Sequence, residues 1–179
     1  MVRFKLRIHD LDARHPGLTS GVATVYREAA EVCLARHHSP PTDLTVDRGR
    51  QVNAVADWQA PDERTKHAWA NEIDATEAGA YCMALAAIEL TDNLVAIRRA
   101  ETHTGADYYV APIGTSPVDL EDAFRLEVSG MDEGTLASVK TRLRQKLEQT
   151  ARGRSSLPAI AAVVAFSPPQ VAIADATPK

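Results

Sequence analysis

The chain has few cysteines and no long apolar run, and both absences narrow the class of protein. Its 179 residues include two cysteines, Cys33 and Cys82, each in an alanine-rich segment, with no CxxC or Cys/His spacing. This pattern excludes a disulfide framework or zinc finger and favours two buried free thiols. The most apolar stretch, 157–166, is too short to cross a bilayer. The N-terminus has no apolar signal segment, so we expect a soluble, cytoplasmic protein without membrane contact.

The chain also lacks the short motifs of several large enzyme classes. It contains no GxSxG elbow, no P-loop and no GxGxxG, which argues against a serine hydrolase, a P-loop NTPase and a dinucleotide-binding enzyme. The net charge is −4, from 20 basic and 24 acidic residues, so the chain as a whole is not basic enough to bind nucleic acid. Any contact with DNA or RNA would therefore use a local basic patch. The richness in alanine and arginine suggests a bacterial source.

The apolar patterning predicts an α/β fold in a single domain over residues 1–179. Residues 2–8 alternate like a half-buried strand, a helix follows from an N-cap at Ser20 to about Arg36, and a hairpin turns around residues 47–50. These elements form an N-terminal β-α-β-hairpin extension over residues 1–62. Such an extension would lengthen the sheet, cover one of its faces or make a homodimer contact.

Residues 63–179 are expected to form the core, a mixed central sheet flanked by helices. A helix capped at Thr76 is predicted to about Leu90, and an amphipathic helix has its apolar stripe at Leu136, Val139, Leu143 and Leu147. Strands are predicted at 94–99, 107–110, 124–130 and 157–166, followed by an edge strand at 171–176. From residue 75 onward, the order is helix, strand, strand, strand, helix, strand.

Three acidic residues in this core suggest a metal site. Asp107 opens the second of these strands, Glu127 lies in the third, and Glu77 lies on the first helix. If the second and third strands are neighbours, Asp107 and Glu127 meet at one edge of the sheet. Two such carboxylates repel one another unless a cation lies between them, and Mg²⁺ prefers hard oxygen ligands. Each acid also has an ordinary interpretation: Asp107 as a turn residue, Glu127 on a solvated strand face, Glu77 as a helix-start acid.

The segments Gly105–Val110 and Leu126–Ser129, in this order of elements, resemble the PD-(D/E)XK nuclease superfamily. The resemblance covers residues 75–166 and implies an αβββαβ core, with Asp107, Glu127 and the Val128 carbonyl binding Mg²⁺ and Glu77 completing the acidic cluster. Ser129 stands where the family has its motif lysine, and it would position a water molecule. We expect Lys140, or failing that Gln145, to approach from the next helix as the replacement, although Lys140 also fits an ordinary surface position.

Two functions follow from this resemblance. The first is a metal-dependent phosphodiesterase that acts on DNA or RNA, in restriction, repair or anti-phage defence. It requires a basic groove beside the acids, expected from Arg98, Arg99, Lys140 and Arg144. The alternative is a non-catalytic relative that serves as a binding or assembly subunit with a protein partner, which the serine at position 129 and the acidic net charge favour.

Overall fold

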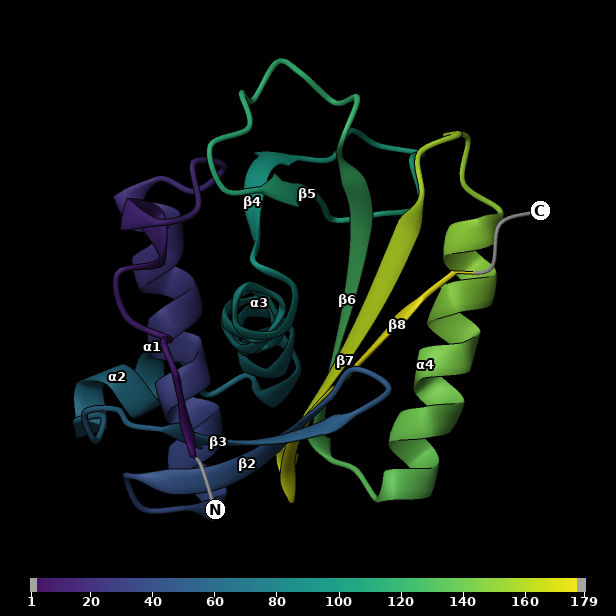
Figure 1. Cartoon of the computed structure of the whole chain (residues 1–179). Coiled ribbons are helices and arrows are strands. Elements are labelled where there is room, and N and C mark those ends of the chain that lie inside the picture. Colours follow the sequence, from purple (N-terminus) through teal and green to yellow (C-terminus); the bar gives the residue numbers. More distant parts are fainter. Residues whose placement is uncertain (1–2, 177–179) are drawn as a thin grey trace.

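The computed structural model describes residues 3–176, which form one eight-stranded mixed sheet with helices on both faces (Figure 1). The strand order is β1-β3-β2-β8-β7-β6-β5-β4. The elements in chain order are β1 (Phe4–Leu6), the short 3-10 helix η1 (Leu11–Ala13), α1 (Ser20–His37), β2 (Thr42–Asp47), β3 (Gln51–Ala56), α2 (Glu63–Ala68), α3 (Glu72–Asp92), β4 (Leu94–Arg99), β5 (Tyr108–Pro112), β6 (Phe124–Glu133), α4 (Leu136–Ala151), β7 (Ala159–Ser167) and β8 (Pro169–Asp175).

The α/β class predicted from the patterning is confirmed. The elements α3, β4, β5, β6, α4 and β7 follow one another in the predicted order. Strands β4, β5 and β6 are antiparallel neighbours, whereas β6 and β7 run parallel, which makes the sheet mixed. Because α4 connects two parallel strands, it crosses over one face of the sheet.

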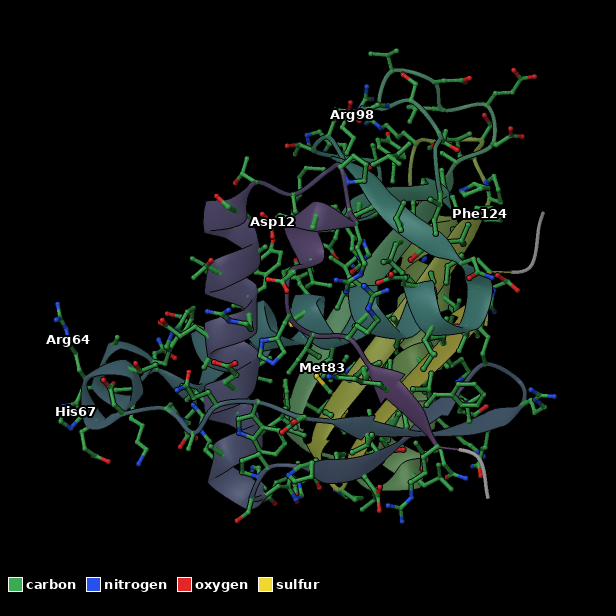
Figure 2. The ribbon with its side chains drawn as sticks, turned by 60° about the vertical axis from the view of Figure 1, so that its left-hand side comes forward. Asp12, Arg64, His67, Met83, Arg98 and Phe124 are labelled. Carbon is green, nitrogen blue, oxygen red and sulfur yellow. The ribbon has the colours of Figure 1, made fainter. Side chains whose placement is uncertain are left out.

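The two faces of the sheet have separate cores, and β7 contributes to both. Ile160, Val164 and Phe166 belong to the large core beneath α1 and α3, which also contains Met83 (Figure 2). The alternate residue Val163 packs with Val139 of α4 on the opposite face. Strand β7 is buried along nearly its whole length, which fits the continuous apolar run in its sequence.

Helices α1 and α3 pack closely because one residue at their contact has no side chain. A Cβ atom added to Gly79 of α3 would lie 2.9 Å from the backbone nitrogen of Ala30 in α1. The many alanines of α3 keep the rest of this interface thin. Helix α3 is thereby held between α1 and the sheet (Figure 1).

The strand expected at 171–176 is present as β8, but its expected position at the edge is wrong, because β8 lies inside the sheet. It pairs antiparallel with β7 on one side and parallel with β2 on the other, where Val46 is the partner of Val171. The N-terminal strands therefore extend the sheet beyond β8. Period-two patterning identifies a strand but does not reveal whether a distant segment pairs with its free side.

Two helix starts also differ from the sequence expectation. Asn71 caps α3, since its side chain accepts hydrogen bonds from the backbone of Ile73 and Asp74, so the helix begins four residues before Thr76. Thr19 rather than Ser20 caps α1. In both cases another cap-forming residue precedes the expected one, five positions earlier for α3 and one position earlier for α1. Val2, the first residue of the expected N-terminal strand, lies outside the described residues.

The outer edge of β4 is covered by the loop that precedes α1. The backbone nitrogen of Ala96 donates to His15 Nδ1 at 2.9 Å, and that of Gly17 donates to the Ala96 carbonyl at 2.8 Å. His15 is fully buried, with Nε2 at 3.3 Å from Glu89. Burial lowers the pKa of His15 to about 4, although Glu89 opposes the change, so the ring is neutral at neutral pH.

The cysteine prediction is confirmed. Cys33 and Cys82 are both buried free thiols, and burial raises the pKa of Cys33 to about 11. Thiols in such surroundings are chemically inert. Among residues 3–176, no helix is both long enough and apolar enough to cross a membrane.

Candidate functional site

A cavity of about 540 Å³ opens beside the first residue of β5, at the point where β6 continues beyond its pairing with β5. Strand β5 pairs only with the first residues of β6, from Phe124 to Leu126. Beyond that point, β6 forms one wall of the cavity, α3 forms a second and α4 a third. The acidic residues of the lining are Glu72, Glu77, Asp107, Glu127 and Asp132, and the basic ones are Arg142 and Lys146.

Asp107 lies directly before β5 and is held against β6. Its backbone nitrogen donates to the Leu126 carbonyl at 2.8 Å, and its Oδ2 accepts a hydrogen bond from the backbone nitrogen of Val128 at 2.8 Å. Its Oδ1 accepts a hydrogen bond from the Tyr81 hydroxyl at 2.8 Å and lies 3.5 Å from Arg99 Nη2. The Asp107 carboxylate is therefore fixed next to the segment of β6 that carries Glu127.

Glu127 faces the same cavity from the neighbouring strand. Its residue is 8% exposed, and Lys146 Nζ donates to its Oε1 at 2.8 Å. Burial raises the pKa of Glu127 above its usual range and the negative charge of Asp107 adds to this, while Lys146 acts in the opposite direction. Two acids from neighbouring segments thus share one partly buried space, in which Lys146 contacts Glu127 and Arg99 contacts Asp107.

The structure brings Lys146 of α4 to this pair and not Lys140, which corrects the expectation. Lys140 is exposed and is not part of the cavity lining, and Gln145 is also exposed. Helix α4 carries two basic pairs with four-residue spacing, Lys140 with Arg144 and Arg142 with Lys146. A helix advances about 100° per residue, so the two pairs lie on opposite flanks of the buried stripe. Only the second flank faces the acids.

Two other predicted residues lie at the cavity in less central positions. Glu77 of α3 lines it with an exposed side chain, and Ser129 of β6 lines it half-buried. Sequence reasoning missed Tyr81 of α3, which holds Asp107. The signal was the four-residue spacing of Ile73, Glu77 and Tyr81, which places them on one face of a helix.

The expected basic groove of Arg98, Arg99, Lys140 and Arg144 does not form as a unit. Arg99 contacts Asp107, but Arg98 bonds Glu101 at 2.6 Å and lies over the Tyr109 ring, on the other face of the sheet. Lys140 and Arg144 are exposed on the far flank of α4. The basic residues next to the acids are instead Arg99, Arg142 and Lys146.

A second group of potential metal ligands lies at the far end of β6. One ligand atom each from His37, Asp132 and Glu133 lies within 4.8 Å of the others. Both Asp132 oxygens are engaged, however, one by Arg36 at 3.1 Å and the other by His37 Nε2 at 3.0 Å. We interpret this group as an ionic link between α1 and β6.

The donor set around Asp107 and Glu127 fits a hard divalent cation. The two carboxylates provide oxygen ligands in a site whose burial raises the pKa of Glu127. The nitrogen of Val128 faces Asp107, and the carbonyl of a strand residue projects from the same strand edge as its N–H. The Val128 carbonyl is therefore a third oxygen directed toward this space.

No protein-family model, no curated protein and no solved structure matches this chain. The residues and geometry of the chain itself are therefore what bears on its function.

Proposed function

We propose that the protein is a metal-dependent phosphodiesterase that cleaves DNA or RNA. The observation that carries the proposal is that Asp107 and Glu127, from neighbouring strands, line one cavity together with a lysine bonded to Glu127. Restriction, repair and anti-phage defence are the settings in which we expect such an activity.

In this proposal, Asp107, Glu127 and the Val128 carbonyl hold the cation. When bound, Mg²⁺ would polarise the phosphodiester and lower the pKa of the attacking water. Tyr81 and the Val128 N–H keep the Asp107 carboxylate in place through their 2.8 Å hydrogen bonds. Lys146 supplies the positive charge that Ser129 cannot, and stabilises the negative charge that develops on the phosphate. The Ser129 hydroxyl orients water at the cavity wall.

The test is cleavage of plasmid, linear DNA and RNA in the presence of Mg²⁺, Mn²⁺ or EDTA. We expect cleavage that needs the metal and falls below detection in Asp107→Ala and in Glu127→Ala. Glu148→Ala, which removes an exposed acid from α4, is the matched control and should cleave like the wild type. Cleavage that persists in EDTA or in either site variant would reject the proposed role of the two acids.

A second candidate function, a non-catalytic binding or assembly subunit, is favoured by one observation. Each acid already has partners within the chain, Lys146 for Glu127 and Tyr81, Val128 N–H and Arg99 for Asp107. Such pairing satisfies both carboxylates without a cation. Calorimetry with Mg²⁺ and Mn²⁺ separates the two functions, because the non-catalytic protein would bind neither ion and cleave no substrate.

A further inference from the structure

Beside the cavity, Arg99 is enclosed by tyrosines from three elements. Its Nη1 donates to the Tyr26 hydroxyl of α1 at 3.2 Å, and its Nη2 donates to the Tyr81 hydroxyl of α3 at 3.3 Å. The guanidinium carbon lies 4.8 Å from the centre of the Tyr81 ring and 4.7 Å from that of Tyr108 in β5. Arginine often stacks on aromatic rings in this way.

The tyrosines also hold one another, so the cradle around Arg99 is rigid. Tyr26 and Tyr81 are stacked with ring centres 4.9 Å apart, and the hydroxyls of Tyr26 and Tyr108 lie 2.8 Å from each other. The Arg99 side chain is nevertheless 50% exposed. A guanidinium that is fixed by the protein and still open to solvent loses little conformational entropy when it binds a ligand.

The positive charge of Arg99 is only partly balanced. Tyr26 and Tyr81 are neutral, since burial raises the pKa of both hydroxyls well above the usual range. Among residues 3–176, the carboxylate in contact with Arg99 is that of Asp107, at 3.5 Å, and its oxygens already accept hydrogen bonds from Tyr81 and Val128. Arg99 therefore keeps the capacity to bind an anion in its exposed half.

The place of Arg99 identifies that anion. Tyr81 and Asp107 both contact Arg99 and both line the cavity, so the guanidinium stands at the cavity rim on the side of α1 and β4. A strand of nucleic acid carries a phosphate on every nucleotide. A strand with one phosphate at Asp107 and Glu127 would bring its next phosphate toward this rim.

We propose that Arg99, together with the Tyr26 hydroxyl, forms a binding subsite for the backbone phosphate adjacent to the one that is cleaved. This inference rests on the proposed function. Arg99 fixes the substrate strand with bidentate donors that Lys could not reproduce. Tyr26 and Tyr81 orient those donors.

Binding is measured with a short labelled single strand and the Glu127→Gln protein, which keeps the contacts of Arg99. Adding Arg99→Gln to this protein should weaken its affinity for the strand about tenfold. The slope of log K against log salt concentration should fall by about one, because one fewer phosphate is neutralised. Arg98→Gln, the same charge change on the other face of the sheet, at the upper end of β4 in Figure 2, should leave the affinity unchanged. Arg99→Lys should recover part of the affinity, and thermal unfolding verifies that every variant is folded.

A strand with one neutral methylphosphonate linkage locates the phosphate. Moving this linkage along the strand should reveal one position, next to the scissile phosphate, where affinity falls about tenfold. In the Arg99→Gln variant, the same linkage should cause no further loss of affinity, because the contact with that phosphate is already absent. An equal loss of affinity with and without Arg99→Gln would show that another residue binds that phosphate, and would overturn the inference. If the true ligand were free phosphate, the neutral linkage would not change the affinity at any position, which would also overturn it.

Steady-state kinetics distinguish a residue that binds the substrate phosphate from one that only holds Asp107 in position. A phosphate subsite predicts a higher KM for Arg99→Gln with kcat changed little, whereas a lower kcat at unchanged KM would reject it. The failures of the two proposals differ. A wild-type protein that neither binds nor cleaves nucleic acid rejects the proposed function, while one that cleaves but in which Arg99→Gln behaves like Arg98→Gln rejects only the subsite.

Discussion

The contact between Lys146 and Glu127 places a positive charge on a flank of α4 that faces the cavity. Both side chains are largely buried, at 19% and 11% exposure, with 2.8 Å between Nζ and Oε1. Removing one partner of such a pair leaves the other charge without compensation. Loss of Lys146 should therefore affect both the ionisation of Glu127 and the charge that develops on the substrate.

The prediction at this scale compares Lys146→Met with Lys140→Met. We expect Lys146→Met to reduce metal-dependent cleavage roughly 10²–10³-fold, which is the usual loss when one donor to a developing charge is removed. Lys140→Met, one of the pair on the far flank, should cleave within about twofold of the wild type, and initial rates at saturating Mg²⁺ provide the measurement. Equal losses in both variants would exclude a specific role for Lys146.

The residue scale also shows what the sequence could reveal about the site. Asp107 and Glu127 were predictable because consecutive strands pair as neighbours more often than not, and period-two alternation fixes their positions. Lys146 was not predictable, because α4 has a basic pair on each flank of its apolar stripe. Only the packing of α4 on β7 decides which of the two pairs faces the acids. Tyr81 was missed for a similar reason: its partner, Asp107, is 26 positions away.

Among the elements, the contact between α1 and α3 depends on a missing side chain. Gly79→Ala would push a methyl group into the backbone of α1 at Ala30, and overpacking of this kind costs about 1–3 kcal/mol of unfolding free energy. Gly21→Ala is the control, because Gly21 is an exposed helix position where the Thr19 hydroxyl would lie 4.0 Å from the new Cβ atom. That change should stabilise the protein by about 0.5–1 kcal/mol. Urea denaturation would contradict the interpretation if both variants shifted in the same direction.

The loop that covers the edge of β4 contains the buried residue His15, which predicts that stability depends on pH. His15 has a folded-state pKa of about 4 against 6.5 for the free side chain, so the unfolded chain takes up a proton first as the pH falls. Stability from this residue is complete above pH 6.5 and is lost as the pH falls toward 4, by about 2 kcal/mol between pH 7 and pH 5. His15→Gln keeps an acceptor for the Ala96 N–H but cannot be protonated. Its urea midpoints should fall less than those of the wild type over this range, and parallel curves would refute the assignment.

Element order was readable from the sequence, whereas the neighbours of the last strand were not. The apolar run of β7 and the amphipathic pattern of α4 are local signals, and both elements lie where expected. The internal position of β8 depends on β2, which precedes it by more than 120 residues. The pairing is non-local, and nothing in the pattern of residues 171–176 indicates it.

On the scale of the whole molecule, the N-terminal strands belong to the same sheet as the strands that carry the acids. Strand β2 pairs with β8, and Arg48 at the end of the hairpin bonds both Asp92 of α3 and Asp175 of β8. Helix α1 covers α3 (Figure 1). Removal of residues 1–62 would expose an unpaired edge of β8 and the apolar surface of α3.

We therefore expect a chain of residues 63–179 to aggregate or to unfold without cooperativity. Circular dichroism during heating, combined with size-exclusion chromatography, checks this against the full chain. A monomeric fragment with a sharp unfolding transition would show instead that residues 1–62 are an accessory to a core that is stable by itself.

The place of β8 has a consequence for biosynthesis. The strand that joins the two halves of the sheet is the last of the described strands to be synthesised, so β2 can pair with β8 only after translation has passed residue 172. Folding that waits for such distant pairings is slow and exposes unfinished strand edges. A polypeptide released early by a premature stop codon, before residue 169, would thus carry its acidic pair on an unfinished scaffold and be a target for proteases.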